Sequence, residues 1–522
     1  MTADVREIPV DDQTMGGMLR WHATSRPDRT AVVCAEQRLS FAELNRRTNR
    51  LANGLLGLGL RPGDRVAVFL GNCAEYIEIY LAMAKSRLTA VPVNTALTAP
   101  EVGYQLADSG ATALIYDQAR GPVVAQLDQT GELAIQPSRR VLLDGSGPGT
   151  FQDLITVADD AEPSLAPERG DYFYQGYTSG TTGRPKGCLQ RHGAFVEHYK
   201  RSFTVYRHGS DDVMLTPGPL FHEAPTLFTL AQLFYGGTVV VLPAFSGAAA
   251  LQAIEAEGCT VVGFAVPTML DRIAACSGGY DVSGVRSIIT AGAPLPAGTM
   301  QATLDRFPAA ELHEFYGATE LGLITDVEHR AYQAKGATTG LPFPGTNIVV
   351  LDDADQPLPP GEVGQVFVTP VMMDGYHNRP EATAADTREF GGVRWFTLGD
   401  MGRIDDEGFL YLVDRKSSMI ITGGENVYPA EVEAVLLEHP AIGEVAVIGL
   451  PDETWGEAVT AVVATSGEPP TIDDVRAHCS GRLAGYKIPK RVVAVSEIPR
   501  TSSGKIQRHV LREQLSGTPA AP

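Results

Sequence analysis

The sequence predicts an α/β protein, with a large N-terminal domain of doubly wound sheets plus a small β unit, followed by a small α+β C-terminal domain. Three observations support this prediction. Short apolar runs alternate with segments of helical spacing over the first two thirds of the chain, which is typical of parallel sheets covered on both faces. The pattern changes twice, after Thr339 and near Asp414. The length of 522 residues also exceeds what one compact core accommodates.

The expected strands of the N-terminal part are short and rich in Val, Ile and Ala. They comprise residues 65–70, 89–94, 111–117, 238–243, 260–265 and 285–293, with helices expected at 75–87 and 248–258. Two strands around a turn rich in Pro, Gly and Asp form the expected small β unit, residues 347–368. The last part predicts a compact α+β domain: a strand from about 414, a helix from 429, strands around 445 and 459, a helix from 472 and a strand at 492.

The charge balance restricts the partners of the protein. With 42 Lys and Arg against 62 Asp and Glu, the net charge of −20 argues against nucleic acid or an anionic membrane surface as the main partner. Six cysteines are scattered without a CxxC pair, which is typical of a reducing compartment. The acidic N-terminus lacks signal-peptide features, and no segment reaches the roughly 18 apolar residues of a membrane helix. We therefore expect a cytoplasmic protein without integral membrane association.

One run, YTSGTTGRPKG at residues 177–187, concentrates glycines, short hydroxyl side chains and a single lysine. Glycines let backbone N–H groups approach phosphate oxygens, hydroxyls add donors, and Lys186 adds a mobile positive charge. The run is not a Walker A motif, because Lys186 is followed by Gly187 instead of Ser or Thr. An exposed turn is the alternative, although a turn would not require Pro185 and Lys186. The run predicts a phosphate-binding loop.

The run also resembles the phosphate-binding signature of the adenylate-forming superfamily, which contains acyl-CoA synthetases, peptide-synthetase adenylation domains and firefly luciferases. The resemblance covers essentially the whole chain, because EFYGATE (314–320), TLGD (397–400) and RTSSGKIQR (500–508) follow in the family's order. It implies three parts: an ATP- and acyl-binding domain at 1–413, a hinge at 414–418 and a mobile C-terminal domain at 419–522.

The resemblance implies specific roles in nucleotide binding. Tyr316 would stack on adenine, Thr319 would bind the α-phosphate, and Glu320 would help to hold Mg²⁺. Asp400 would accept hydrogen bonds from the two ribose hydroxyls, with Arg415 beside it. The complete set expected to bind ATP is Thr178, Ser179, Gly180, Thr181, Thr182, Gly183, Lys186, Gly292, Ala293, Pro294, Tyr316, Gly317, Asp400 and Arg415.

The catalytic residues implied by the resemblance are Lys505, Thr319 and His222. A carboxylate must attack the α-phosphorus of ATP although both partners are negative, and Lys505 would bridge the two and offset the repulsion. His222 replaces the Asp of amino-acid-activating relatives, which disfavours an α-amino acid. Its ring would steer the substrate carboxylate, and a core histidine is the alternative.

The acyl pocket implied by the resemblance is apolar, and fatty, aryl and short unsaturated acids remain open. Its expected lining consists of Phe221, His222, Phe264, Val266, Ala291 and Phe315. Glu223 has two readings. An exposed Glu223 would have no role, whereas inside the pocket it would accept a hydrogen bond from an amine or hydroxyl of the substrate.

Coenzyme A is the expected acceptor, with a free-standing acyl carrier protein or another small nucleophile or oxyanion as the alternative. Gly423 and Gly424 would let a thiol arm pass, although a tight strand turn explains them equally well. Ser417 stands where the family's hinge commonly has Asp or Lys, which keeps the alternative acceptor open. A luciferase-like oxygenase and a non-catalytic binder have less support from the residues. We expect a monomer or a homodimer.

Overall fold

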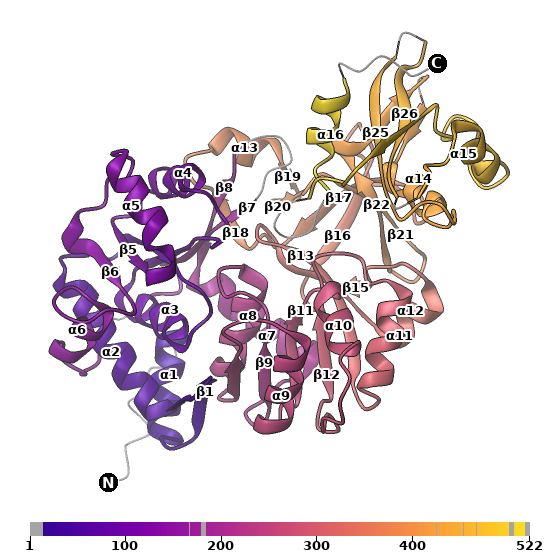
Figure 1. The fold of residues 1–522 in the computed structure, drawn as a ribbon. Coiled ribbons are helices and arrows are strands. Elements are labelled where there is room, and N and C mark those ends of the chain that lie inside the picture. The colour runs from indigo at the N-terminus through magenta and orange to yellow at the C-terminus, as the bar shows by residue number, and fades with distance from the viewer. Residues whose placement is uncertain are drawn as a thin grey trace. The chain divides into compact units, whose positions relative to one another are not determined.

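The computed structural model describes residues 14–165, 167–178, 184–423, 425–452, 454–465, 467–500 and 506–516. The chain forms two compact units, Met1–Asn347 with Thr369–Trp395 and Ile348–Val368 with Phe396–Pro522. The predicted mixed α/β class is confirmed (Figure 1). The predicted hinge at 414–418 lies within the second unit, and the domain limits at 413 and 419 remain predictions.

Two large sheets form the framework of the first unit. In its described part, one sheet has the order β15-β14-β13-β12-β11-β9-β10-β1-β2. Its strands are β1 (Thr30–Cys34), β2 (Gln37–Ser40), β9 (Val213–Thr216), β10 (Thr238–Val241), β11 (Val261–Ala265), β12 (Ser287–Thr290), β13 (Glu311–Ala318), β14 (Gly322–Glu328) and β15 (Leu341–Pro342). The pairs from β1 to β13 along this order are parallel, and the outer pairs are antiparallel.

The second large sheet of this unit has the order β18-β8-β7-β4-β3-β5-β6 among the described residues. Its strands are β3 (Arg65–Phe69), β4 (Thr89–Pro92), β5 (Ala113–Tyr116), β6 (Arg140–Leu142), β7 (Tyr172–Thr178), β8 (Lys186–Arg191) and β18 (Met373–Tyr376). The pairs from β4 to β6 and the β4–β7 pair are parallel, whereas β7, β8 and β18 pair antiparallel.

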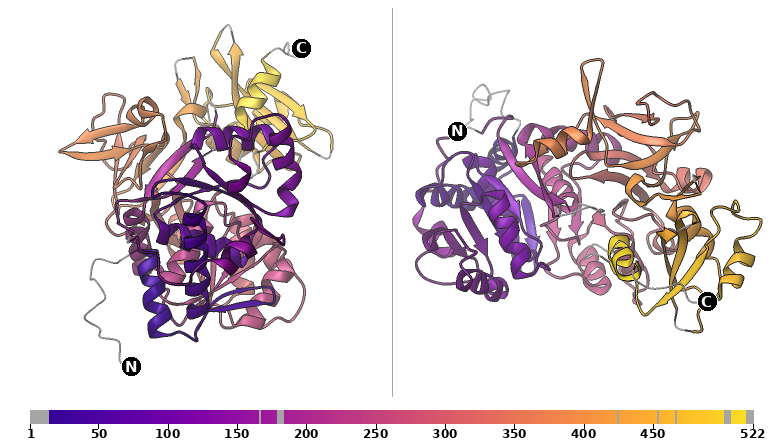
Figure 2. Two further views of the ribbon diagram at one scale, coloured as in Figure 1. Left: turned by 90° about the vertical axis from the view of Figure 1, so that its left-hand side faces the viewer. Right: turned by 90° about the horizontal axis from the view of Figure 1, so that it is seen from above.

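Helices cover both faces of these sheets, in agreement with central strands that are buried at every position (Figure 1, Figure 2). On β10, Val239 and Val241 belong to the core between the sheets, whereas Val240 faces the outer core under α9, α10 and α11. The core between the sheets also receives α1, α2, α3, α7 and α8, and the outer face of the second sheet is covered by α4 and α5. The layers therefore run helix, sheet, helix, sheet, helix.

The structure describes the following helices in the first unit. They are α1 (Met15–Ser25), α2 (Phe41–Gly57), α3 (Ala74–Ser86), α4 (Ala99–Ser109), α5 (Gly121–Gln129), α6 (Phe151–Val157), α7 (His192–Tyr206), α8 (Glu223–Phe234), α9 (Gly247–Glu257), α10 (Pro267–Ala274), α11 (Ala297–Arg306), α12 (His329–Lys335) and α13 (Pro380–Ala385). A reciprocal capping box starts α2, because Ser40 Oγ accepts from the Glu43 N–H and the Glu43 carboxylate accepts from the Ser40 N–H.

The second unit has a small antiparallel sheet and an α+β part. The small sheet includes β16 (Asn347–Leu351), β17 (Gly364–Thr369), β21 (Asp400–Ile404) and β22 (Leu410–Arg415). Strands β19 (Thr387–Phe390) and β20 (Val393–Phe396) precede β21 in the chain. The α+β part contains β23 (Ile420–Thr422), β24 (Glu425–Val427), α14 (Pro429–Leu436), β25 (Glu444–Asp452), β26 (Gly456–Ala464), α15 (Ile472–Cys479), β27 (Arg491–Val495) and α16 (Arg508–Leu515). One core joins α14 and α15 to β25 and β26, and a second core joins α16 to the same strands.

Most predicted elements are confirmed within a few residues, including the two strands at 347–368 and the order of elements after 414. Helix α16 is one of the elements that the sequence analysis did not predict. It shows the strongly amphipathic pattern of a surface helix but buries only Leu511. Among the described residues, no helix is both long and apolar enough to cross a bilayer.

A buried ion pair offers a test of how α2 and α3 pack. Glu78 on α3 is fully buried, and its Oε1 lies 2.9 Å from Nε of Arg47 on α2. Burial raises the pKa of Glu78 to about 7, and Arg47 opposes that rise. Because the folded-state pKa lies above the ordinary value of 4.5, Glu78 is protonated in the folded protein at pH 5 and ionises as the pH passes 7.

We therefore expect Arg47→Met to lower the free energy of unfolding by about 2 kcal/mol at pH 8, and by clearly less at pH 5. At pH 8 the variant must either keep Glu78 protonated or bury an unpaired charge. Urea denaturation at both pH values measures the difference. The matched control is Arg46→Met, at the exposed neighbouring position of the same helix. An equal loss at pH 5 and pH 8 would contradict a charge-based role.

Candidate active site

Two β-hairpins, one from each large sheet, bring the predicted phosphate-binding residues together. Strands β7 and β8 form the first hairpin, and Thr178 pairs with Lys186 where its loop begins and ends. Strands β13 and β14 form the second, with Thr319 in the turn between them. The two meet at this turn: Gln190 Nε2 on β8 donates to the Thr319 carbonyl at 2.5 Å, and a Cβ placed on Gly176 would lie 3.1 Å from Thr319 Cγ2.

The second hairpin depends on a close backbone approach at Gly317. A Cβ at this position would lie 2.3 Å from the carbonyl oxygen of Gly322 on the facing strand, so no other residue fits without a shift of the backbone. Tyr316, the predicted adenine contact, precedes it on β13 and is half-buried. The glycine of EFYGATE therefore fixes the geometry that presents Tyr316 and Thr319.

Several predicted residues lie outside the described residues. They are Ser179, Gly180, Thr181, Thr182 and Gly183 of the phosphate loop, Gly424 of the expected thiol channel, and the catalytic candidate Lys505. The backbone of Ser417 is described as part of a short 3₁₀ turn, and its side chain is not. Their roles remain predictions.

Tyr376 on β18 connects a predicted phosphate ligand, Lys186, with the predicted magnesium ligand, Glu320, and sequence reasoning missed it. The Nζ of Lys186 lies 3.9 Å from the centre of the Tyr376 ring, a cation–π contact. The Tyr376 hydroxyl donates to Glu320 Oε1 at 2.9 Å, and both residues are about 7% exposed. Burial and the neighbouring Glu320 raise the pKa of Tyr376, so the phenol stays protonated and remains a donor. Lys186 Nζ also lies 4.0 Å from Asp386 Oδ2.

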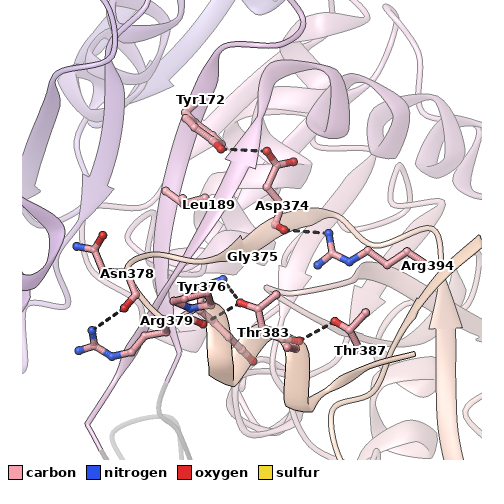
Figure 3. Close-up of a pocket in the computed structure, with 12 residues that line it drawn as sticks. Tyr172, Leu189, Asp374, Gly375, Tyr376, Asn378, Arg379, Thr383, Thr387 and Arg394 are labelled. Carbon is pink, nitrogen blue, oxygen red and sulfur yellow. Dashed lines mark hydrogen bonds between the residues drawn. The ribbon is translucent and has the colours of Figure 1, made fainter. Parts of the chain in front are cut away.

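Tyr376 also lines a shallow surface pocket of about 530 Å³ between β8, β18 and α13 (Figure 3). Its Asp374 carboxylate accepts from the Tyr172 hydroxyl at 3.0 Å, and the Asp374 carbonyl accepts from Arg394 at 2.9 Å. The Tyr376 N–H donates to Thr383 Oγ1 at 2.9 Å. None of the described residues predicted to bind ATP or acid lines this pocket.

The residues predicted to bind the acyl group lie near one another in two groups. Phe264 and Phe315 have ring centres 6.0 Å apart, and Phe315 also packs at 5.5 Å against Phe228 of α8. Val266 packs beside Gly292, where a Cβ would lie 3.4 Å from Val266 Cγ1. Gly292, Ala293 and Pro294 form an exposed loop after β12, and Ala291 before them is buried.

The second group lies at the start of α8. Phe221 is half-buried, with its ring centre 4.6 Å from that of His222. His222 is exposed, so the alternative of a core histidine is wrong. Glu223 is half-buried, with its carboxylate oxygen Oε2 buried, so the reading of Glu223 as a fully exposed side chain is wrong as well.

The second unit carries the predicted ribose ligands on adjacent strands. Asp400 on β21 lies opposite Arg415 on β22, with Arg415 Nε 3.2 Å from Asp400 Oδ1. Asp400 is 7% exposed. In the same unit, Gly423 adopts a φ of 60° and donates its N–H to the Trp455 carbonyl at 2.8 Å. The left-handed conformation explains this glycine as a tight turn, and its role toward a thiol remains a prediction.

Comparison with known proteins agrees with this arrangement. Residues 19–377 match the family described as AMP-binding enzyme, and residues 431–505 match its C-terminal domain. A feruloyl-CoA synthase of Amycolatopsis is 39% identical over 510 residues, which cover 97% of this chain and 99% of that protein. A fatty acid–[acyl-carrier-protein] ligase, ScoC of Streptomyces coeruleorubidus, is 34% identical over 523 residues and covers 97% and 98%.

A solved structure extends the comparison to the fold. The ATP-bound MatB of Rhodopseudomonas palustris has a TM-score of 0.85 and 29% identity, covering 97% of this chain and 99% of that one. The sheets and helices described above are therefore those of an adenylate-forming enzyme.

The Tyr376 contacts predict separable effects of its ring and its hydroxyl. Tyr376→Phe keeps the ring next to Lys186 but removes the donor to Glu320, so we expect the Mg²⁺ concentration needed for half-maximal ATP binding to rise about tenfold. Tyr376→Leu removes both contacts and should weaken ATP binding a further fivefold or so. Titration calorimetry with ATP at several Mg²⁺ concentrations measures both effects.

Tyr172→Phe is the matched control, because this tyrosine also donates to a carboxylate on the same sheet but contacts neither Lys186 nor Glu320. It should leave both affinities unchanged. If Tyr376→Phe binds ATP with the normal Mg²⁺ dependence, the hydroxyl does not orient the metal-binding carboxylate.

Proposed function

Because the chain belongs to the AMP-binding enzyme family, we propose that it is an ATP-dependent, AMP-forming acid–CoA ligase. It joins a small carboxylic acid to AMP with release of pyrophosphate, and then exchanges AMP for the thiol of coenzyme A. The observation that carries this proposal is the meeting of the β7–β8 and β13–β14 hairpins at Thr319. The family match over both parts of the chain and the named relatives support it.

In the first step, a carboxylate oxygen of the acid attacks the α-phosphorus of ATP. The bond from that phosphorus to the bridging oxygen breaks, and pyrophosphate leaves. Thr319 donates to the α-phosphate, and Lys186, held beside Tyr376, supplies positive charge near the departing phosphates. Lys505 offsets the repulsion between carboxylate and phosphate. Catalysis here is positioning and electrostatic stabilisation, since no covalent enzyme intermediate is needed.

The residues at Glu320 fit a magnesium ion. A buried carboxylate is the kind of hard oxygen donor that Mg²⁺ prefers, and the Tyr376 hydroxyl orients that carboxylate. When bound, Mg²⁺ would neutralise charge on the triphosphate oxygens. We assign Glu320 to hold the ion.

In the second step, a thiol attacks the carbonyl carbon of the acyl adenylate, a thioester forms, and AMP leaves with the electron pair of the broken bond. The proposed C-terminal domain presents Lys505 for the first step and the segment at Gly423 and Gly424 for the second. The turn at Ser417 absorbs the rotation between the two poses.

The pocket residues favour an apolar acid. Phe264 and Phe315 present ring surfaces, and His222 lies exposed beside Phe221, where it can meet a carboxylate. Aryl, fatty and short unsaturated acids all satisfy this chemistry. A panel of these acids, assayed for pyrophosphate release with and without coenzyme A, identifies the substrate. If no acid in the panel releases pyrophosphate, the proposed function fails.

An acyl carrier protein is the second candidate acceptor. It is favoured by Ser417, which departs from the usual hinge residue, and by the similarity to ScoC. Comparing thioester formation with coenzyme A and with carrier proteins decides between them. Release of acyl adenylate without any coenzyme A thioester would favour the carrier. A cytoplasmic location and a monomeric or homodimeric state remain predictions.

The role of Lys505 predicts different effects on the two steps. Lys505→Ala should lower the rate of pyrophosphate release by about 10²–10³, because a well-placed electrostatic group is lost. Thioester formation from a synthetic acyl adenylate should fall much less. Lys200→Ala, which removes a surface lysine paired only with an exposed Glu197 among the described residues, is the control. Equal loss in both half-reactions would count against the assignment.

A further inference from the structure

Gln190 and Glu223 form a buried polar pair to which the proposed reaction assigns no role. Gln190 on β8 is completely buried, and its Nε2 donates both to the Thr319 carbonyl at 2.5 Å and to Glu223 Oε1 at 3.2 Å. Glu223 is the first residue of α8, and its Oε2 is buried. A single amide therefore joins β8, α8 and the turn between β13 and β14.

Each of the three joined elements carries a residue assigned to the reaction. Strand β8 begins at Lys186, the turn carries Thr319 and Glu320, and α8 is preceded by His222. A shift of the amide would change the position of the α-phosphate ligand relative to both the cation and the carboxylate-steering histidine. Misplacement of reacting groups by about 1 Å can cost 10² in rate.

We propose that Glu223 and Gln190 form a positioning pair, which holds the Thr319–Glu320 turn in register with Lys186 and His222 and thereby aligns the α-phosphate with the acyl carboxylate. The inference rests on the proposed function. Neither residue touches the reacting atoms, so both act through Thr319.

The surroundings explain why a carboxyl group is tolerated so near a polyanion site. Burial raises the pKa of Glu223 to about 8, although Thr319 and Gln190 lower it, and the charge of Glu320 raises it further. The carboxyl is therefore mostly neutral at pH 7 and adds little negative charge beside Glu320. Four other buried groups interact electrostatically with Glu223. Burial raises the pKa of each, so they stay protonated at pH 7: Tyr80, Tyr174, Tyr199 and Cys188.

The pair predicts a graded series of variants. Glu223→Gln is neutral, has the same shape and still accepts from Gln190, so pyrophosphate release should stay within about threefold of normal. Glu223→Val and Gln190→Leu each break the link, and each should lower kcat for pyrophosphate release about 30-fold, while KM for ATP rises less than threefold. Gln190→Leu removes the hydrogen bonds to both Thr319 and Glu223, so the double variant should be no worse than Gln190→Leu alone.

Gln232→Leu is the matched control for losing a buried glutamine. Gln232 lies on the same helix α8, is 1% exposed and donates to the carbonyls of Gly209 and Asp212, with no contact to Thr319. It should lower the melting temperature as much as Gln190→Leu does but leave kcat of the folded protein unchanged. Thioester formation from synthetic acyl adenylate should be normal in all variants.

Hydrogen exchange gives a readout that does not need activity. Peptides covering residues 314–322 should exchange faster in Glu223→Val and Gln190→Leu, and at the normal rate in Glu223→Gln and Gln232→Leu. If the wild-type protein releases no pyrophosphate with any acid, the proposed function fails, while this exchange pattern still decides whether the pair holds the turn.

Three outcomes would overturn the proposal. The first is unchanged exchange at the turn together with unchanged kcat in both link-breaking variants. The second is a loss of kcat in Gln232→Leu as large as in Gln190→Leu, which would show a general effect of a damaged core. The third is a loss confined to acids that carry an amine or hydroxyl, which would make Glu223 a substrate contact.

Discussion

The proposed phosphate site depends on contacts between two sheets, at the turn that carries Thr319 and Glu320. Parallel strands are joined by long crossovers, usually helices, whereas antiparallel strands can be joined by a short turn. Here each sheet ends its parallel run with an antiparallel hairpin, and the two hairpins approach until the Gln190 amide reaches the Thr319 carbonyl. Gly176 and Gly317 make the approach sterically possible. Without the hydrogen bonds from Gln190 to Thr319 and from Tyr376 to Glu320, the turn would have no fixed relation to the other sheet.

These contacts also show how a protein with a net charge of −20 can hold a polyanion. The charged groups near Thr319 are each held by contacts with neighbouring side chains. Lys186 lies against the ring of Tyr376, whose hydroxyl donates to Glu320, so one side chain contacts both a cation and a carboxylate. Glu223 is kept largely neutral by burial. The attraction for phosphate is therefore a property of the hairpins and not of the overall field.

The fold was predictable from the sequence where the physical cause is local. Runs such as TVVV in β10 are buried on both faces, so their β-branched composition alone predicts a strand. The glycines and hydroxyls at 177–187 predict phosphate binding because the chemistry lies within one loop. Tyr376 and Gln190 were not predictable, because their roles arise only when β18 and β8 pair and α8 packs beside them. A tyrosine in a short edge strand and a glutamine in a strand carry no local signal of that kind. Helix α16 was missed because it buries a single leucine.

The acceptor is harder to predict from the site than the activation step is, for a physical reason. An acyl adenylate is a mixed anhydride, and its carbonyl reacts with whichever nucleophile is brought to it. The residues proposed to make it, at the two hairpins and the start of α8, therefore place no constraint on the second substrate. In the proposed second step, the constraint would lie in how a thiol arm is guided past the backbone near Gly423 and Ser417. Related enzymes can accordingly share the activation chemistry and still differ in acceptor, and acceptor choice can change without any change at Thr319, Glu320 or Lys186.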